Sequence, residues 1–338
     1  MTSLALILGC AGPTLSRDEA AFFRDARPWG FILFKRNIET PEQVRALTAA
    51  LRETVGRDDA PILIDQEGGR VQRMGPPHWR AYPSGRSYLR AGGTENAPAL
   101  ARLGARLMAH DLASVGINVD CAPVLDVPVP GAHDVIGERA YGTDPDTVAR
   151  IGRAVAEGLM EGGVLPVVKH MPGHGRAGAD SHHALPVVDA DRASLEAHDF
   201  RPFRALVDMP MAMSAHVVFT AIDPDGPATT SARVIAEVVR GHIGYDGLLM
   251  TDDLSMRALS GDFRSRTAAA FRAGCDVGLH CNGDRAEMEG VVAAAPALAG
   301  DALRRARAAL ARLAPASASG FDAAEARARL EAGLAAAA

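Results

Sequence analysis

The sequence predicts a single (β/α)8 TIM-type barrel. Eight short apolar runs recur along the chain, and segments with apolar residues at helical spacing separate them. The predicted strands are residues 4–8, 30–34, 61–64, 117–119, 164–168, 211–214, 247–250 and 277–279. Alternation of strands and helices indicates a parallel sheet with right-handed crossovers. Eight such units within about 290 residues are typical of a closed barrel rather than an open, doubly wound sheet.

The helical segments are marked by their periodicity and by the residues at their starts. The predicted helices are residues 41–55, 99–115, 145–160, 192–207 and 232–242. The residues expected to act as N-caps are Asp18, Thr40, Thr143 and Ser231. Residues 72–93 and 127–143 are expected to be long loops that wall a cleft at one end of the barrel.

The chain is expected to form one domain. From about residue 284 it is rich in Ala and Arg and predicts a helical tail to the barrel. No linker, low-complexity tract or internal repeat divides the 338 residues. We therefore expect domain boundaries of 1–338, and a monomer.

Composition excludes several classes of partner. Of all residues, 48% are apolar, enough for a large core, and the net charge is −5 from 36 basic and 41 acidic residues. This balance does not favour nucleic acid. No apolar run approaches the roughly 18 residues of a membrane span. No glycine-rich phosphate-binding pattern is present, so no nucleotide or other cofactor is expected.

The cysteines and the N-terminus indicate a cytoplasmic protein. The four cysteines are Cys10, Cys121, Cys275 and Cys281. They lack CxxC spacing, so free thiols in a reducing compartment are expected. Residues 4–10 superficially resemble a lipoprotein signal. However, no Lys or Arg precedes them, and five apolar residues fall short of the usual 7–15. A first barrel strand is the better interpretation.

One polar segment stands out as a candidate active site. Residues 169–175 (KHMPGHG) and 180–183 (DSHH) follow the predicted strand 164–168 and hold four of the eleven histidines. Barrel enzymes keep their catalytic groups at the carboxyl ends of the strands. Asp65, His216 and Asp252 follow other predicted strands, so all these groups are expected on one rim.

Two positions are suited to acid–base and nucleophilic chemistry. Asp252 lies where a predicted strand opens into the barrel mouth, and a carboxylate there can attack an electrophilic carbon. Its neighbour Asp253 is expected to have a structural role. Asp180 precedes His182 by two residues, a spacing that lets the carboxylate hold the imidazole tautomer and favour its protonated form. His182 can then act as a general acid and base.

Further charged residues suit the recognition of hydroxyl groups. The candidates are Asp65, Arg73, Arg139, Lys169 and His170. Each could instead form a salt bridge at the rim, and Arg139 is the one most easily interpreted in that way. No metal site is expected. The first predicted strand is not followed by a His-x-His pair, and Pro172 and Gly173 disfavour a helix that would align His170 with His174.

Four motifs, in this order, carry a family resemblance. They are residues 64–73 (IDQEGGRVQR), 122–127 (APVLDV), 169–175 with 180–183, and 251–256 (TDDLSM). Together they closely resemble the family 3 glycoside hydrolases, specifically the bacterial β-N-acetylhexosaminidases of peptidoglycan recycling, from about residue 7 to about residue 283. Two departures are small: Met171 stands where Phe is usual, and residues 176–179 are a variant of the loop's middle.

The resemblance implies roles for the candidate residues. Asp252 is the implied nucleophile, His182 the acid/base and Asp180 its partner. The implied N-acetylglucosamine contacts are Asp65, Arg73, Arg139, Lys169 and His170. The implied enzyme is a retaining exo-β-N-acetylglucosaminidase that acts on muropeptides without a metal, through a covalent glycosyl-enzyme. Gly173, Gly175 and Gly178 are expected to let the catalytic loop move.

Three alternatives remain open at this point. A neutral histidine base repels phosphate less than a carboxylate does, so the enzyme could be an N-acetylglucosaminide phosphorylase. A non-catalytic sugar-binding barrel is disfavoured because Asp252 and His182 are both present. A metal-dependent hydrolase would be separated from these by a chelator.

Overall fold

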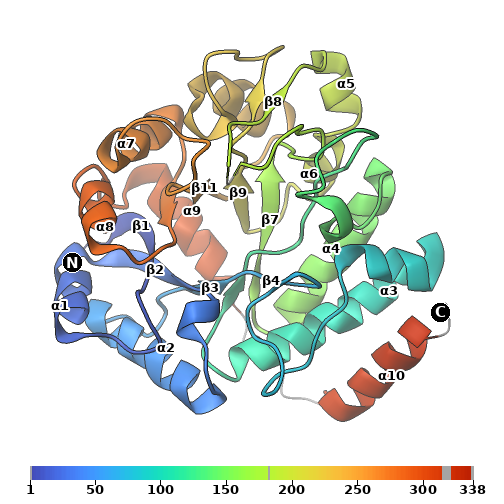
Figure 1. Ribbon diagram of the computed structural model, residues 1–338, viewed down its shortest axis with the longest axis horizontal. Coiled ribbons are helices and arrows are strands. Elements are labelled where there is room, and N and C mark those ends of the chain that lie inside the picture. The colour runs from blue at the N-terminus through green and yellow to red at the C-terminus, as the bar shows by residue number, and fades with distance from the viewer. Residues whose placement is uncertain (1, 182, 314–320, 336–338) are drawn as a thin grey trace.

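The computed structural model has the barrel that the sequence predicts (Figure 1). It describes residues 2–181, 183–313 and 321–335. Within them, eight parallel strands close in the order β1, β12, β11, β9, β7, β6, β3 and β2. These strands are β1 (Leu4–Gly9), β2 (Pro28–Leu33), β3 (Ile62–Ile64), β6 (Val119–Asp120), β7 (Leu165–Met171), β9 (Met211–Ser214), β11 (Leu248–Asp253) and β12 (Val277–His280). Each lies at its predicted position.

Two of these strands run three residues further than predicted, with consequences for the site. β7 continues to Met171, so Lys169 and His170 belong to the strand end and not to the loop after it. β11 continues to Asp253, so Asp252 also lies within a strand. These residues therefore belong to the ends of barrel strands and not to the loops that follow.

Helices surround the strands. They are α1 (Arg17–Ala26), α2 (Pro41–Val55), α3 (Gly85–Ala113), α4 (Pro145–Glu161), α5 (Arg192–Ala197), α6 (Arg201–Ala205), η4 (Val234–His242), α7 (Phe263–Ala273), α8 (Arg285–Val292), α9 (Gly300–Leu310) and α10 (Ala323–Ala335), with the short turns η1 (Lys35–Asn37), η2 (Gly137–Arg139) and η3 (Ala228–Thr230). The last helix, α10, lies against α3 on the outside of the barrel (Figure 1).

Two predictions about helices and loops are wrong in part. The predicted loop 72–93 is helical from Gly85, where α3 begins, and Gly93 kinks that helix with a φ of 57°. The predicted helix 192–207 is two helices, because Pro202 has no N–H to continue the first and instead starts α6.

Two of the four predicted N-caps are confirmed, and two are wrong. Thr40 accepts a hydrogen bond from the backbone N–H of Gln43, and Ser231 accepts one from Val234. In α1, Ser16 is the cap and Asp18 lies in the first turn. In α4, Asp144 is the cap in place of Thr143, since Pro145 occupies the first helical position.

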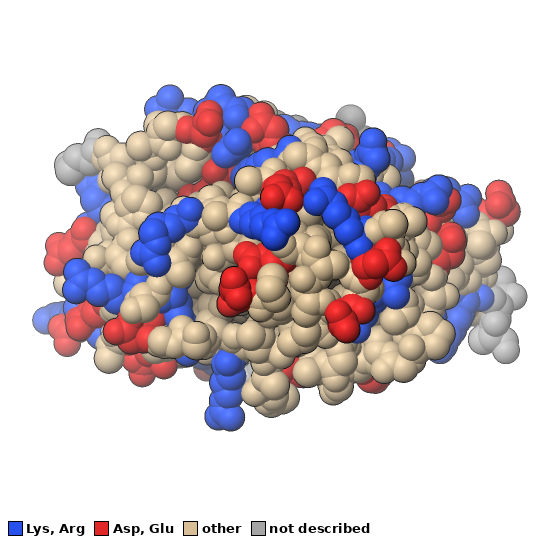
Figure 2. All heavy atoms as spheres, turned by 90° about the horizontal axis from the view of Figure 1, so that it is seen from above, with Lys and Arg blue, Asp and Glu red and all other residues tan. Residues whose placement is uncertain are grey.

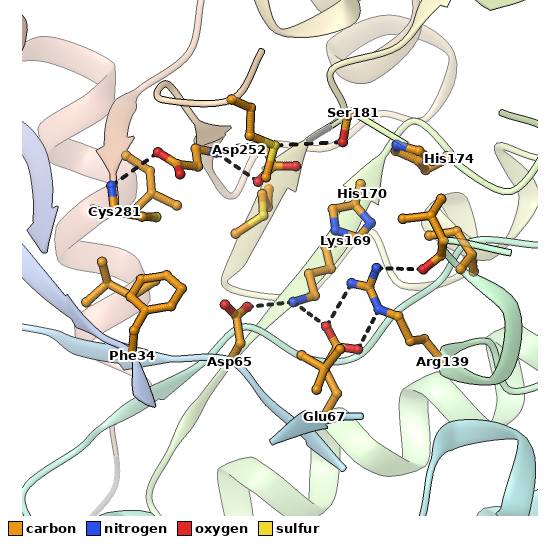
Figure 3. Close-up of a pocket in the computed structure, with 18 of the residues that line it drawn as sticks. Phe34, Asp65, Glu67, Arg139, Lys169, His170, His174, Ser181, Asp252 and Cys281 are labelled. Atoms are coloured by element: carbon orange, nitrogen blue, oxygen red, sulfur yellow. Dashed lines mark hydrogen bonds and ion pairs between the residues drawn. The ribbon is translucent and has the colours of Figure 1, made fainter. Parts of the chain in front are cut away.

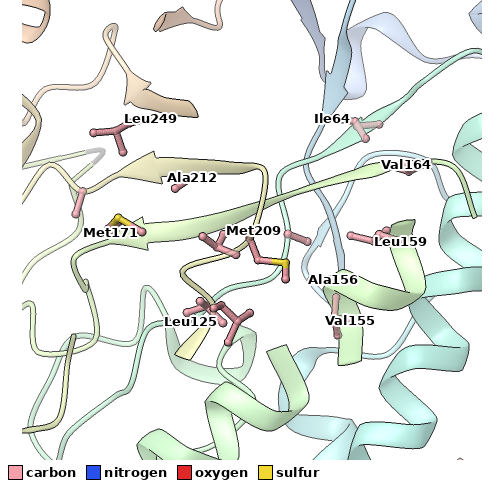
Figure 4. Close-up of a cluster of buried hydrophobic side chains, with 14 of the residues drawn as sticks. Ile64, Leu125, Val155, Ala156, Leu159, Val164, Met171, Met209, Ala212 and Leu249 are labelled. Atoms are coloured by element: carbon pink, nitrogen blue, oxygen red, sulfur yellow. The ribbon is translucent and has the colours of Figure 1, made fainter. Parts of the chain in front are cut away.

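The core has two layers, as the period-two pattern of strands requires. Inward-facing strand residues fill the barrel itself: Ala5, Ile7, Ile32, Leu63, Val119, Leu165, Val167, Met211, Met213, Leu248, Met250, Val277 and Leu279. The alternate residues face the helices, among them Leu6, Leu8, Ile62, Ile64, Val168, Ala212 and Leu249. Figure 4 shows part of this outer layer, a buried cluster that includes Met171 of β7, Ala212 of β9 and Val155, Ala156 and Leu159 of α4.

Two short strand pairs lie outside the barrel. β4 (Gln66–Gly68) and β5 (Val71–Gln72) form a hairpin directly after β3, and β8 (Val187–Val188) pairs with β10 (Val218–Phe219). The hairpin requires glycine at Gly68, which has a φ of +91° and where a Cβ would lie 2.2 Å from the Pro83 carbonyl oxygen. The tight turn lets the hairpin fold back over the barrel mouth beside Asp65.

The surface carries both signs of charge. Figure 2 shows acidic and basic side chains interspersed over one face of the molecule. Within the described residues, no helix is both long enough and apolar enough to cross a bilayer. The four cysteines are buried free thiols, as predicted.

Candidate active site

Strand periodicity aims the candidate residues into the barrel mouth. On β7, Leu165 and Val167 face the barrel interior, so Lys169 is the next inward position. On β11, Asp252 follows the inward residue Met250 in the same way. Asp65 stands two residues after the inward Leu63. These polar residues therefore form the layer directly above the apolar barrel core.

A pocket of about 250 Å³ opens above that core (Figure 3). Sites for drug-sized ligands are roughly 300–1,000 Å³, so this pocket suits one small ligand. Of the seven predicted site residues that the structure describes, six line it: Asp65, Arg73, Arg139, Lys169, His170 and Asp252. Apolar residues form much of the rest: Ile32, Phe34, Val71, Val135, Ile136, Met213, Met256 and Leu279.

Five of the lining residues form a chain of alternating charges. Lys169 Nζ lies 2.8 Å from Asp65 Oδ1 and 2.6 Å from Glu67 Oε1. Arg139 donates two hydrogen bonds to the carboxylate of Glu67, at 2.8 and 2.9 Å. Arg73 donates to Asp65 at 3.1 Å. Figure 3 shows Asp65, Lys169, Glu67 and Arg139 together on one side of the pocket, with Asp252 on the other.

The network keeps every member charged. Burial alone would raise the pKa of Glu67, but Arg139 and Lys169 more than offset it and lower the pKa to about 2. Burial also disfavours the charge on Lys169, which is only 2% exposed, yet Asp65 and Glu67 hold its pKa above the ordinary value. Asp65 is likewise held ionised, against its burial, by Lys169 and Arg73.

The network restricts how its members can meet a ligand. An ammonium has three donors, and two of those on Lys169 point to the carboxylates. One donor of Lys169 therefore remains for a ligand in the pocket. Each carboxylate oxygen can accept more than one hydrogen bond, so Asp65 can still accept from a ligand hydroxyl. The sequence left open whether Arg139 forms a rim salt bridge or contacts a ligand. In the structure Arg139 forms a salt bridge with Glu67 and also lines the pocket.

A buried aspartate orients His170. Asp126 Oδ2 lies 2.7 Å from His170 Nδ1, and Asp126 Oδ1 accepts from the backbone N–H groups of His170 and His174. Although burial opposes it, His170 lowers the pKa of Asp126, so this carboxyl stays ionised. An ionised carboxylate only accepts, so Nδ1 carries the proton and Nε2 is left for the pocket. Burial lowers the pKa of the neighbouring His174 to about 4, so that ring is neutral at neutral pH.

Asp252 is the carboxylate opposite the network. It is 6% exposed, and its Oδ1 accepts a hydrogen bond of 2.8 Å from the Asp253 backbone N–H. Burial would raise the pKa of Asp252, but His216 and His170 hold it below the ordinary value. Asp253 accepts from Ser255 and from the Cys281 N–H, as expected of a structural residue.

The catalytic loop is anchored at both ends. Arg176 Nε donates to buried Asp199 at 2.6 Å, and His133 N–H donates to the Ala177 carbonyl at 2.9 Å. Further on, Ala258 N–H donates to the Ser181 carbonyl. Asp180 is partly buried, with Oδ2 at 3.9 Å from His183 Nε2. The predicted acid/base, His182, lies outside the described residues.

The sequence did not single out two residues that organise the site. Glu67 joins Lys169 to Arg139, and Asp126 fixes His170. Both stand inside the quoted motifs, and Glu67, like Asp65, closely follows the predicted strand 61–64, an end that the sequence places at the rim. Across the described part of the chain, no group of three or more His, Cys, Asp or Glu side chains has an arrangement that would hold a metal.

Comparisons with known proteins identify the family and match the fold. A family model for the glycosyl hydrolase family 3 N terminal domain matches residues 8–313. Beta-hexosaminidase from Alkalilimnicola ehrlichii is 41% identical over 285 residues, which cover 82% of this chain and 80% of that protein. NagZ from Neisseria gonorrhoeae, solved with N-trifluoroacetyl-D-glucosamine, is 30% identical, with a TM-score of 0.88 over 99% of both chains. A structure of NagZ from the same organism with a zinc ion is 29% identical, with a TM-score of 0.83 over 100% of this chain and 98% of that one.

The barrel, the pocket at its carboxyl rim and these matches define a barrel glycosidase. The chain belongs to glycosyl hydrolase family 3. The family predicted from the four motifs is therefore confirmed, and so is the predicted class of enzyme, a hydrolase of glycosidic bonds.

Proposed function

We propose that the enzyme is a retaining exo-β-N-acetylglucosaminidase in which Asp252 is the nucleophile. The observation that carries the proposal is the ionised Asp252 carboxylate, which lines a small pocket opposite the Lys169 network. A pocket with an apolar floor admits one terminal sugar residue, which favours an exo mode of attack. The hexosaminidase relatives support an N-acetylated sugar as the substrate.

In the first step a carboxylate oxygen of Asp252 attacks the anomeric carbon. The bond from that carbon to the leaving oxygen breaks, and His182 donates its proton to that oxygen. The product is a glycosyl ester of Asp252 with inverted configuration. Asp180 is the partner that favours the protonated imidazole before this step.

In the second step water replaces the leaving group. His182 takes a proton from the water, whose oxygen attacks the anomeric carbon as the ester bond to Asp252 breaks. Two inversions restore the β configuration, and both Asp252 and His182 return to their starting protonation states.

The charged network binds the sugar. Asp65, Arg73 and Lys169 lie together on one wall and offer acceptors and donors to vicinal hydroxyl groups. His170 presents Nε2, and Arg139 adds further donors beside Glu67. A pocket of paired charges disfavours a ligand that leaves them unmatched.

The natural substrate in this proposal is a peptidoglycan fragment, a muropeptide that ends in β-linked N-acetylglucosamine. On the motif resemblance, the proposal is a cytoplasmic recycling enzyme that acts as a monomer. We also propose that residues 1–338 form one domain, with the helices from Arg285 onward as the tail to the barrel.

The test compares an aryl β-N-acetylglucosaminide with the matching aryl β-glucoside. Each unmatched buried polar group costs about 1–3 kcal/mol, so two or three predict a preference of roughly a hundredfold or more in kcat/KM. Equal values for the two sugars would contradict the assigned substrate. The same assay with and without inorganic phosphate separates hydrolysis from phosphorolysis, since phosphorolysis releases a sugar 1-phosphate.

The proposed reaction uses a carboxylate and an imidazole, so activity should survive dialysis against EDTA. Zinc is the metal to test because a related structure contains it. Loss of activity on chelation, restored by zinc, would overturn the assignment of roles. An unchanged kcat after chelation is the expected result.

A further inference from the structure

A buried histidine, His216, contacts the residue that follows the nucleophile. His216 follows the end of β9 by two residues and is 0% exposed. It does not belong to the pocket lining. Strand β9 pairs with β11 only as far as Met250, opposite Met213. The three residues of β11 that follow, including Asp252, lie past the last pair of that ladder.

Regular pairing is also lost on the other side of β11. Its register with β12 shifts between Met250 and Asp253. Such irregularities bend a strand and re-aim its side chains. Pairing with β12 resumes at Asp253, opposite Leu279, so Asp252 lies between two ladder pairs and contacts outside the ladder help to hold it.

The ring of His216 supplies one such contact. His216 Nε2 lies 3.0 Å from the Asp253 carbonyl oxygen, which only accepts, so Nε2 carries a hydrogen and donates it. The backbone N–H of the same Asp253 donates to Asp252 Oδ1 at 2.8 Å. One residue thus links the ring of His216 to the carboxylate that faces the pocket.

The other side of the ring is anchored as well. His216 Nδ1 lies 2.8 Å from Thr229 Oγ1, which lies 2.7 Å from Ser214 Oγ. Both hydroxyl residues are buried. Thr229 Oγ1 also donates to the Ala215 carbonyl oxygen at 3.1 Å, so every member of the network has a partner. A satisfied buried network of this kind holds one geometry.

We propose that His216 is a positioning residue that holds the end of β11, through the Asp253 carbonyl, in the conformation that aims Asp252 at the anomeric carbon. This inference rests on the proposed role of Asp252. A displacement of about 1 Å at a reacting group can cost about 10²-fold in rate, so the effect should fall on the chemical step.

The test compares three variants on the aryl β-N-acetylglucosaminide. His216→Ala should lower kcat by about 10- to 100-fold, while KM and the Kd of the product N-acetylglucosamine stay within about threefold. His216→Gln should recover most of the lost kcat, because its amide can donate to the Asp253 carbonyl.

His280→Ala is the matched control. His280 is also 0% exposed and ends the neighbouring strand β12, but its Nε2 lies 3.1 Å from Glu287 of α8, away from the nucleophile. The His280→Ala variant should keep a kcat within about threefold of the parent value. This should hold even if its thermal unfolding midpoint falls as far as that of His216→Ala. Equal kcat losses in the two alanine variants, or no recovery with glutamine, would overturn the proposal.

A further variant, at Thr229, tests the proposal if His216→Ala does not fold. Thr229→Val removes the hydroxyl that holds Nδ1 and should lower kcat by about 3- to 10-fold with little change in KM. An unchanged kcat would overturn the proposal. If Asp252 forms no covalent adduct, the function proposed above fails instead. If Asp252 forms the adduct but His216→Ala turns over normally, only the positioning role fails.

Discussion

Asp252 is an ionised carboxylate that lines the pocket. Its Oδ1 accepts from its own neighbour's N–H, and His216 and His170 keep it ionised despite its burial. Replacing it with asparagine preserves the shape and the contact with Asp253 but removes the nucleophilic oxygen. Asp252→Asn should therefore lower kcat by at least about 10³-fold with an unchanged fold. Steady-state kinetics and circular dichroism measure both, and activity near that of the parent would contradict the nucleophile assignment.

Sequence predicts the residues that line the pocket better than the residues that hold them in place. Asp65, Lys169 and Asp252 stand at strand ends, where periodicity alone predicts an inward direction. Glu67 and Asp126 act through long-range partners, 102 and 44 residues away along the chain at Lys169 and His170 respectively. Nothing in local spacing indicates which cation each will meet. That pairing emerges only when the strands close into the barrel.

At the scale of elements, the catalytic loop divides into a packed half and an exposed half. The sequence predicts that three glycines let it move, but Gly175 lies against Val127, where a Cβ would come within 2.1 Å of the carbonyl oxygen. Gly173 lies against buried Asp199. Only Gly178 is exposed, with nothing within 4 Å of its Cβ position. Motion therefore has room to begin at Gly178, beyond the Arg176–Asp199 ion pair.

Two matched substitutions test that division. Gly175→Ala should destabilise the fold by about 1–3 kcal/mol, because Val127 backbone must shift to admit a methyl group. Gly178→Ala should leave the unfolding free energy within about 0.5 kcal/mol. Chemical denaturation measures both values. Equal losses for the two variants would show that the first half of the loop is not packed as described.

The strand ladder was predictable because apolar runs of about three to five residues recur with helices between them. The helix boundaries were less predictable. The start of α3 at Gly85 escapes prediction because Gly92 and Gly93 lie within it and Gly93 kinks it. Thr143 fails as a cap because fixed φ at Pro145 moves the start of α4 by one residue.

At the scale of the whole molecule, the charged site makes stability depend on pH. Asp65, Glu67, Asp126 and Asp252 all have folded-state pKa values below their ordinary ones. Each contributes stability that is present above the unfolded value and is lost as pH falls through the folded value. For Glu67 the stability is lost as pH falls from the unfolded pKa, about 4.3, to the folded pKa, about 2. Asp120 acts in the opposite sense, because burial raises its pKa.

Among the described residues, carboxyls with lowered pKa values outnumber those with raised ones, which are Glu19, Asp120 and Asp199, so the unfolding free energy should decrease on acidification below about pH 5. The expected slope is about 1.4 kcal/mol per pH unit for each extra proton that the unfolded chain binds. Urea denaturation at a series of pH values measures it. Glu67→Gln should be less stable than the parent at neutral pH and should show a shallower slope. An identical slope in the variant would contradict the charge network.

The central claim is that Asp252 forms a covalent bond to the sugar. The most direct measurement incubates the intact enzyme with a slowly hydrolysed, fluorinated N-acetylglucosaminyl substrate and analyses its peptides by mass spectrometry. We predict one added glycosyl group on Asp252, in a peptide that contains residues 251–256, and none in Asp252→Asn. A glycosyl group on another residue, or steady turnover with no adduct at any time, would contradict the account.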